Sequence, residues 1–427
     1  MTDGYDRDIV ALQLVVLTWL TWWMVRSLRA LARGDRRTIL FLQLVYYFFF
    51  AVPLLLDLAV GPPTYTYQRG FIVSQFDHST NLIYLLYLAV IPVMFTVLGG
   101  RRAALAGATP LVKLRLGPWA RALAWMAMLS LPFVIVLAPQ PSEFLEYAAY
   151  IGKQAAGVEQ YQVIVTMAAT MAAISAVLVI SAEGSSVLAR VTAIPFLSVA
   201  VWIHGKRSVV ALALLLLLYL LWMRGVLQGR RFIAAALACG LALGVFSYAY
   251  QASVRNIGEG EPMRDQRFEA SDLYVNYRID YGRDAVAKQT IYAELNPSEL
   301  AILEHRGQSL LFYATIFVPR RLWPNKPLTY PAYVTAAMFD FEPRDIGWGV
   351  TTSWLEEAIA NLGWIGMLFG PAIPALICAI GDRRRSPTIG VLTVSVASFL
   401  LVLSLVAFFV MAVLWVIVVV RGRPQRP

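Results

Sequence analysis

Charged residues are scarce in this chain, and their scarcity excludes an ordinary soluble protein. Asp, Glu, Lys and Arg make up 15% of the 427 residues, whereas 59% are hydrophobic and the mean hydropathy is +0.63. A soluble domain is nearer half apolar. Apolar runs of about 20 residues, the length that a helix needs to cross a membrane, recur along the sequence. The composition therefore predicts one polytopic, all-α membrane domain over residues 1–427.

Cysteine and the motifs of soluble enzymes are also nearly absent. Cys239 and Cys378 lie in apolar segments, which argues against a structural disulfide, and neither has the Cys or His neighbours of a metal site. There is no P-loop and no glycine-rich dinucleotide turn after a strand. Asp6 and Asp8 have the Asp-x-Asp spacing used to hold a metal-bound nucleotide sugar, but on a charged terminal tail we interpret them as a solvated end. These features predict no metal and no cofactor.

The apolar segments predict about eleven membrane-spanning helices. An acidic N-terminus without a small-residue cleavage site indicates that the first of them is retained rather than removed as a signal peptide. The final stretch, 388–420, is longer than one helix needs to cross a core of about 30 Å, so we expect two short helices there. The other expected spans are residues 9–25, 38–60, 81–98, 120–138, 161–181, 189–204, 208–223, 231–251 and 358–380.

The formal net charge of +10 indicates an orientation in the membrane and does not argue for nucleic acid. More than half of the 36 Lys and Arg residues fall in gaps on one side of the stack of spans, and the positive-inside rule makes that side cytoplasmic. The N-terminus and the long segment 252–357 are then extracytoplasmic, and the C-terminus is cytoplasmic. The basic gaps are Arg26–Arg37, Arg101–Arg121, Arg190, Arg224–Arg231, Arg383–Arg385 and Arg421–Arg426.

The segment 252–357 is too rich in aromatic and apolar residues to be a disordered linker. We expect it to form a large, partly helical extracytoplasmic loop inserted between spans. Residues 309–318 form an apolar run that is too short to cross the membrane, a length typical of a re-entrant or interfacial segment.

The first candidate site is the turn 204–208, which lies on the side opposite to most basic residues. Lys206 and Arg207 stand there beside His204. Cations in a tight extracytoplasmic turn are what an anionic ligand such as a phosphate requires. The alternative is that they are anchors reaching from a helix end to the membrane surface.

The second candidate site is the proline-rich loop 318–327. Its three prolines fix φ and stiffen the backbone. Arg320, Arg321 and Lys326 are thereby held in place, and Trp323 suits the membrane interface. The alternative is a rigid basic anchor at that interface.

The third candidate site is the start of the helix that we expect near residue 354. Glu356 and Glu357 enter this helix at its outer end, and Glu357 and Asn361 share one helix face, where they can hydrogen-bond. The alternative is that the acids only complement the positive helix N-terminus, with Ser353 as the cap.

The fourth candidate site is the stretch 277–284, in which charges alternate with tyrosines. Arg278, Asp280 and Arg283 are polar candidates here, and the tyrosines could stack on sugar rings. The alternative is a solvated surface helix with ion pairs along it.

Three parts of the sequence together resemble bacterial O-antigen polymerases, the Wzy-type oligosaccharide repeat-unit polymerases. These parts are the stretches 319–327 and 347–363 and the turn 205–208. The resemblance covers the layout of spans and the motifs between residues 252 and 363. It implies a membrane glycosyltransferase with a fold similar to the GT-C class, located in the bacterial inner (plasma) membrane. The donor would be a growing glycan on undecaprenyl diphosphate and the acceptor one lipid-linked repeat unit. The product would be O-antigen or exopolysaccharide, and a chain-length regulator protein is a candidate partner.

The resemblance also assigns roles by motif. Arg207, Arg320, Arg321 and Lys326 correspond to the family's basic positions, and Glu357 to the acid four residues before Asn. Many members carry a polar stretch between the last two spans, where this chain has the uncharged residues 403–408.

The expected mechanism follows from the chemistry of a diphosphate leaving group. Arg207 and Arg320 would clamp the diphosphate, because preorganised cations stabilise charge as it develops. Glu357, or His204 as second choice, would act as general base. The expected substrate-binding residues are Lys206, Arg278, Asp280, Arg283, Arg321, Trp323, Lys326 and Glu356. The alternatives are an O-antigen ligase or a glycolipid flippase or other transporter, although transporters favour charged or broken spans near the midplane.

Overall fold

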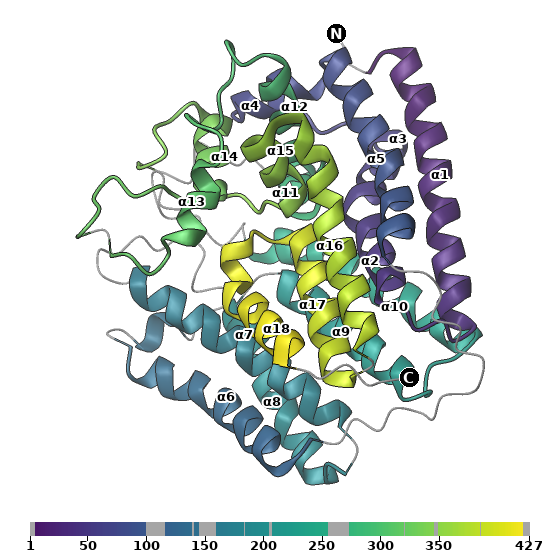
Figure 1. Cartoon of the computed structure of the whole chain (residues 1–427), viewed down its shortest axis with the longest axis vertical. Coiled ribbons are helices and arrows are strands. Elements are labelled where there is room, and N and C mark those ends of the chain that lie inside the picture. The colour runs from purple at the N-terminus through teal and green to yellow at the C-terminus, as the bar shows by residue number, and fades with distance from the viewer. Residues whose placement is uncertain are drawn as a thin grey trace. The chain divides into compact units, whose positions relative to one another are not determined.

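The computed structural model describes residues 5–99, 116–138, 141–144, 159–182, 184–204, 207–254, 273–319, 321–345, 349–384 and 386–421. Within these ranges the chain is helical and contains no strand, as expected for an all-α protein (Figure 1). It forms two compact units. The first unit is Met1–Ala104 with Gln251–Pro427, and the second unit is Leu105–Tyr250.

The helices fall into the two units as follows. The first unit contains α1 (Arg7–Ala32), α2 (Thr38–Tyr46), the π-helical turn η1 (Tyr47–Ala51), α3 (Val52–Ala59), α4 (Arg69–Gln75), α5 (His78–Leu98), α11 (Leu273–Tyr281), α12 (Asp284–Leu295), α13 (Gln308–Ala314), α14 (Tyr330–Phe339), α15 (Trp354–Leu362), η4 (Gly363–Ile365), α16 (Gly366–Arg383), α17 (Pro387–Val402), η5 (Leu405–Phe408) and α18 (Phe409–Arg421). The second unit contains α6 (Pro118–Val136), η2 (Pro141–Phe144), α7 (Glu159–Ser181), α8 (Val187–His204), α9 (Arg207–Met223) and most of α10 (Arg230–Val254).

Each segment expected to span the membrane lies on a helix of the structure. Among the described residues, five helical segments are long and apolar enough to cross a membrane. These are Arg7–Ala32, Thr38–Ala59, His78–Leu98, Pro118–Val136 and Trp354–Arg383. The stretch 388–420 divides into α17 and α18, so the expectation of two short helices there is confirmed. The count of eleven spans stays a prediction.

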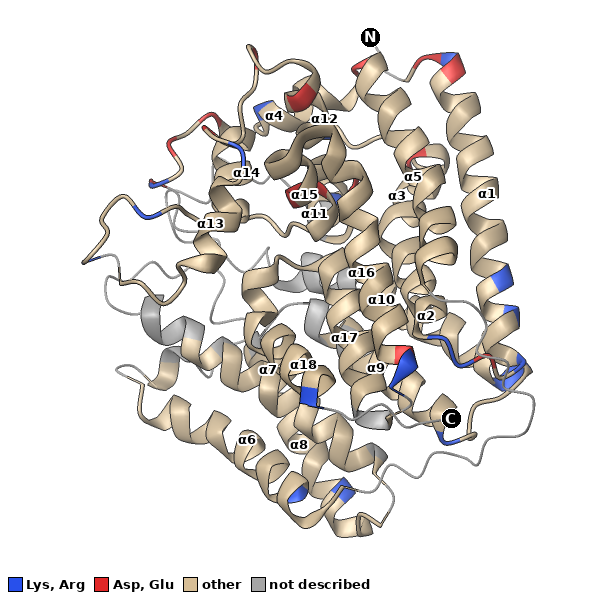
Figure 2. Cartoon of the chain, in the orientation of Figure 1, with Lys and Arg blue, Asp and Glu red and all other residues tan. Residues whose placement is uncertain are grey.

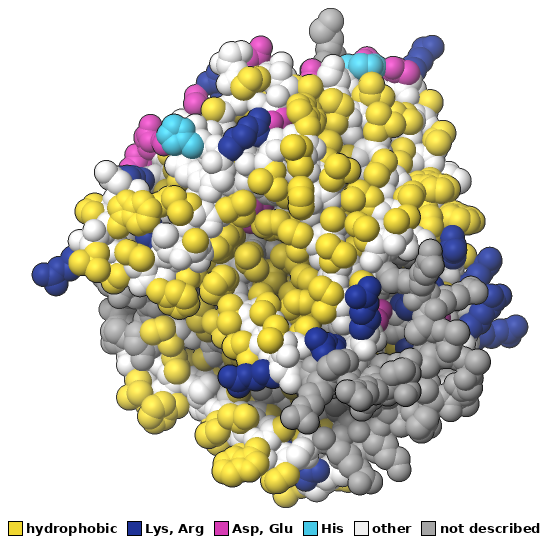
Figure 3. All heavy atoms as spheres, in the orientation of Figure 1, with side chains coloured by type: hydrophobic (Ala, Val, Ile, Leu, Met, Phe, Trp, Pro, Cys, Tyr) yellow, Lys and Arg dark blue, Asp and Glu magenta, His cyan; other side chains and the backbone are white. Residues whose placement is uncertain are grey.

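The surface of α5 shows why the first unit needs an apolar environment. One face of α5 is buried against the protein, yet the opposite face is also apolar and exposed. The exposed residues are Leu82, Leu86, Val90, Val93 and Val97. A helix facing water carries polar residues on its outer face, so this pattern indicates a helix that faces lipid. Figure 3 shows hydrophobic side chains over much of the drawn face of the first unit.

Charge is segregated along α1. The helix begins beside Asp6 and Asp8 and has Arg26 and Arg29 near its end. Figure 2 shows acidic residues gathered where α1 begins, and many Lys and Arg residues where it ends. This distribution is the one that the positive-inside rule describes, with the beginning of α1 as the acidic end of the first unit.

The second unit is held together by small residues on α7. This helix packs against both α6 and α8, and its buried face is made of alanines that let neighbouring helices approach closely. Leu131 and Ile135 of α6 and Ala200 and Ile203 of α8 complete the cluster. The buried alanines of α7 include Ala168, Ala169, Ala172 and Ala173.

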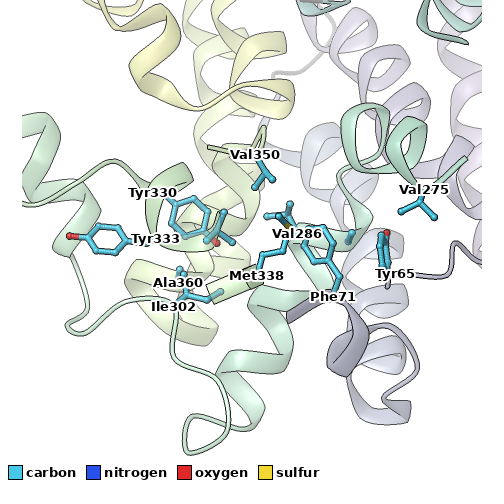
Figure 4. Close-up of a cluster of buried hydrophobic side chains, with 12 residues drawn as sticks. Tyr65, Phe71, Val275, Val286, Ile302, Tyr330, Tyr333, Met338, Val350 and Ala360 are labelled. Atoms are coloured by element: carbon cyan, nitrogen blue, oxygen red, sulfur yellow. The ribbon is translucent and has the colours of Figure 1, made fainter. Parts of the chain in front are cut away.

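The described part of the long segment 252–357 is packed, as its aromatic content predicts. It shares a buried apolar cluster with α4 and α15, drawn in Figure 4. Tyr330 and Val334 are fully buried in this cluster, which also contains Phe71 of α4. The run expected to be re-entrant contains the short helix α13, and its placement at membrane depth stays a prediction.

Candidate functional site

The beginning of α15 brings two buried glutamates into the first unit. Ser353 is the N-cap, and its Oγ accepts a hydrogen bond from the Leu355 N–H at 3.2 Å. The Glu356 carboxylate accepts in turn from the Ser353 N–H and hydroxyl, which completes a capping box. Ser353 is the cap, as the alternative interpretation of the sequence had it, and the structure adds a capping role for Glu356, whose contact with substrate stays a prediction.

Glu357 faces a different set of partners. The Ser309 hydroxyl donates to Glu357 Oε1 at 2.9 Å, and the Tyr313 hydroxyl donates to Oε2 at 3.1 Å. Asn361 Nδ2 donates to the Glu357 carbonyl at 2.7 Å and to Ser309 Oγ at 2.8 Å. Glu357 and Asn361 share a helix face as predicted, and the hydrogen bond between them runs from the Asn361 side chain to the Glu357 main-chain carbonyl. Each carboxylate oxygen has a protein donor, so this carboxylate is positioned rather than free to rotate.

Tyr313 is a dependable donor in this arrangement. Burial, together with the charge of the neighbouring Glu357 carboxylate, raises the pKa of Tyr313 well above its ordinary value. The phenol therefore stays protonated at neutral pH and keeps its hydrogen for Glu357. Its ring stacks on Phe409, with centroids 6.3 Å apart, so the start of α18 also borders the site.

The proline-rich loop is attached to the same short helix. Lys326 Nζ donates to the carbonyls of Ile316 and Val318, both at 3.1 Å, and lies 5.0 Å from the ring centroid of Phe312. Lys326 is buried, and these contacts hold the loop against the end of α13. The observed role of Lys326 is therefore to anchor the loop, while its contact with a phosphate stays a prediction.

Helix α13 thus joins two of the motifs found in the sequence. Ser309 and Tyr313 on the helix hold Glu357, and the carbonyls that follow the helix hold Lys326. Arg321, in the loop that Lys326 anchors, is exposed, and Trp323 is half-buried. One short helix thus contacts the buried Glu357 and also Lys326 of the loop that carries the exposed Arg321.

Arg283 belongs to the fourth motif and is buried at the corner between α11 and α12. Its Nε donates to the carbonyl of Val402 at 3.1 Å, and its backbone N–H donates to the carbonyl of Phe49 at 3.3 Å. Val402 is the last residue of α17, where helix carbonyls lack intrahelical donors. Phe49 lies in the π-helical turn η1, which precedes Pro53, a residue without an N–H to donate to the preceding turn.

Arg278 is the centre of a buried ion cluster. Its guanidinium donates to Asp57 through Nη1 and to Asp284 through Nη2, the latter at 2.6 Å. Burial opposes its charge, but the carboxylates of Asp284 and Asp57 raise the pKa of Arg278 above its ordinary value. The expected alternative, a solvated helix, is wrong for this residue, since its side chain is 0% exposed. We assign Arg278 a structural role because both carboxylates engage it.

Lys288 completes the ion cluster, and the sequence reasoning missed it. Its Nζ donates to the Tyr5 hydroxyl at 2.8 Å, and that hydroxyl donates to Asp57 Oδ2 at 3.0 Å. Burial lowers the pKa of Lys288, while Asp57 and Asp284 oppose this shift. A signal was present in the sequence, because Asp57 is a lone acid in an apolar span, and such residues have partners.

Several predicted residues lie outside what the structure describes. Lys206 and Arg320 are not described, nor are the side chains of His204, Arg207 and Asp280. The predicted meeting of Arg207 and Arg320 with Glu357 therefore stays a prediction.

The comparisons with known proteins add no assignment. No known protein family, curated protein or solved structure matches this chain. The chemistry of the site is read from its own residues: a positioned carboxylate, held by two hydroxyl donors, beside a loop that carries arginine.

Proposed function

We propose that this chain is a membrane glycosyltransferase that joins oligosaccharide repeat units carried on undecaprenyl diphosphate, on the extracytoplasmic side of the membrane. The observation that supports this most directly is the shared attachment of Glu357 and the arginine-bearing loop to α13. A glycosyl transfer from a diphosphate requires both a proton acceptor and cations. These two needs correspond to the two motifs that α13 joins.

The carboxylate would act on the acceptor. The acceptor hydroxyl attacks the anomeric carbon of the donor, and Glu357 takes the hydroxyl proton as general base. An ionised carboxylate has about four lone-pair sites, so the bonds from Ser309 and Tyr313 leave Glu357 able to accept another. Glu357 is 0% exposed, so the acceptor hydroxyl can reach it only after the packing around the carboxylate opens.

The basic loop would act on the donor. The bond from the anomeric carbon to the diphosphate oxygen breaks, and the electron pair leaves with the lipid diphosphate. Arg320 and Arg321, with Arg207 from the other candidate site, would stabilise the negative charge that develops on the phosphate oxygens. Loss of one such preorganised donor typically costs about 10²–10³ in rate. The planar guanidinium suits this task because it binds two phosphate oxygens at once.

The test is glycan polymerisation in cells that depend on this chain. Arg207→Ala, Arg320→Ala and Glu357→Gln should each abolish long-chain glycan while the protein is still made and inserted. Matched controls are Arg69→Ala and Glu304→Gln, which change exposed residues of the same charge. Arg320→Lys should be impaired, because lysine cannot replace a two-point contact. Undiminished long-chain polymer in the Arg320→Ala and Glu357→Gln cells would refute the assignment.

The product separates this proposal from its closest alternative. A polymerase leaves a ladder of chain lengths on lipid diphosphate, whereas an O-antigen ligase transfers finished glycan to lipid A or protein. Analysis of the lipid-linked fraction by gel and mass spectrometry distinguishes the two. A chain needed only for glycolipid transport would instead leave single repeat units on the cytoplasmic face.

A further inference from the structure

The acidic end of the first unit carries a second cluster of chemically active side chains, away from Glu357. Asp6 is the N-cap of α1, Asp8 lies in the first turn of that helix, and His78 is the first residue of α5. One ligand atom from each of these residues lies within 4.8 Å of the others. Helices α1 and α5 pack against each other, so residues 72 positions apart meet at two adjoining helix starts.

Both helix starts are fixed by contacts outside the cluster. Asp77 caps α5 by accepting a hydrogen bond from the Thr80 N–H at 2.7 Å. Tyr5, which precedes Asp6, is held by Lys288 at 2.8 Å and by Gln75 at 2.7 Å. The three side chains are solvent-exposed, as the sequence suggested for Asp6 and Asp8, but they are carried by anchored backbone.

The orientation of the imidazole is the informative feature. His78 Nδ1 lies 3.2 Å from Asp6 Oδ2, and Nε2 lies 3.6 Å from Asp8 Oδ2. A neutral imidazole donates from one nitrogen only. With Nδ1–H bonded to Asp6, the Nε2 lone pair faces a carboxylate oxygen of Asp8, and a cation placed between these two acceptors would be bound by both.

The distances fit a metal ion in that position. Zinc binds imidazole nitrogen and carboxylate oxygen at about 2.0–2.2 Å, which in a tetrahedral site places neighbouring ligand atoms about 3.4 Å apart. Histidines that bind metals usually donate their other N–H to a carboxylate, which fixes the ring. Asp6 stands in that place. The mixed nitrogen and oxygen ligands favour zinc and similar transition metals over magnesium, which prefers oxygen.

We propose that Asp8 and His78 form a surface site for a divalent transition metal, with Asp6 orienting the imidazole and water completing the coordination. The side chains of Asp6, Asp8 and His78 are 69%, 65% and 49% exposed, so the ion has free access. Binding joins the start of α1 to the start of α5. The site is independent of the proposed transferase chemistry, and neither depends on the other.

The experiment uses the full-length protein in detergent, without a histidine tag, and Zn²⁺ alone as the probe. Calorimetry at pH 7.5 should show one saturable Zn²⁺ site per chain in the wild type. His78→Gln and Asp8→Asn should each weaken binding at least tenfold, and Asp6→Asn about 10–100-fold, as expected for an orienting partner. His305→Gln, which changes an exposed histidine elsewhere in the first unit, should bind Zn²⁺ like the wild type. Co²⁺ should give visible absorption bands that are lost in His78→Gln.

Two results would overturn the proposal. One is Zn²⁺ binding in His78→Gln that matches the wild type, because the ion would then sit elsewhere. The other is no saturable binding to a wild type that elutes as a single species in gel filtration, which would leave the cluster as a polar surface contact without a metal. Neither readout involves glycan. A failure of the metal-site proposal therefore leaves the proposed transferase function unaffected, and a failure of the transferase proposal leaves the metal site unaffected.

Discussion

The buried ion cluster around Arg278 should dominate the stability of the first unit, and Arg278→Met tests this directly. In the wild type, Arg278 and Lys288 balance Asp57 and Asp284, so the cluster is neutral when all four are ionised. The side chains of Arg278, Asp57 and Asp284 are at most 2% exposed. Methionine has a similar length but no charge, so the variant leaves one uncompensated negative charge in a buried site.

The expected magnitude follows from that burial. Removing one partner of a buried ion pair typically costs about 3–5 kcal/mol, because the remaining charge loses its partner without regaining water. Arg69 and Asp340 make an ion pair of the same length, 2.6 Å, but their side chains are 72% and 70% exposed. Such a surface pair contributes about 0–1 kcal/mol. Arg69→Met is therefore the matched control.

The charge balance makes a sharper prediction for a double variant. Asp57→Asn removes one negative charge, so Arg278→Met with Asp57→Asn restores a neutral cluster of Lys288 and Asp284. The double variant should be more stable than Arg278→Met alone, by a coupling of about 0.5–3 kcal/mol. If the arginine acted only through its volume, the two losses would instead add.

The assay is the half-life of monodisperse protein in detergent at a fixed elevated temperature, because unfolding of membrane proteins is often irreversible. Arg278→Met should lose monodisperse protein much faster than the wild type, and Arg69→Met should not. Equal half-lives for Arg278→Met and Arg69→Met would refute the reasoning. So would a double variant that is less stable than either single one.

Two further predictions concern α13 and α15. Tyr313→Phe should lower glycan polymer yield in cells but keep the protein folded, because it removes one donor to Glu357 Oε2 and retains the ring on Phe409; unchanged polymer length and yield would show that this hydrogen bond is dispensable. Gly363→Ala should cost about 1–3 kcal/mol, since its φ of 66° and ψ of −147° lie in a region essentially restricted to glycine, and a thermal half-life equal to the wild type would contradict this.

Local patterns in the sequence predicted the local features of the structure. Apolar runs marked the helices because burial and lipid both select for them. Ser353 was expected as the cap of the helix that begins near residue 354, and the structure confirms it. The i, i+4 spacing likewise placed Glu357 and Asn361 on one helix face, because residues four positions apart lie one above the other on a helix.

Local sequence patterns could not predict the contacts between segments that are distant in the sequence. Arg278 and Asp57 are 221 residues apart, and Lys288 and Tyr5 are 283 apart. No local spacing says which loop packs on which helix, so the buried ion pairs of Arg278 were not predicted and Lys288 was overlooked. The available clue was chemical rather than positional: an acid in an apolar span requires a buried cation, and Asp57 had none nearby in the sequence.

The same reasoning gives a role to the C-terminal helices. The family resemblance leads one to expect polar residues between the last two spans, whereas residues 403–408 carry no charge. In the structure, the Arg283 guanidinium, which comes from another segment, donates to the carbonyl of Val402 at the end of α17. Phe409 follows this break and stacks on Tyr313, which holds Glu357. The uncharged break is thus held on one side by Arg283 and on the other by the tyrosine that binds Glu357, so its sequence can stay apolar while its position remains constrained.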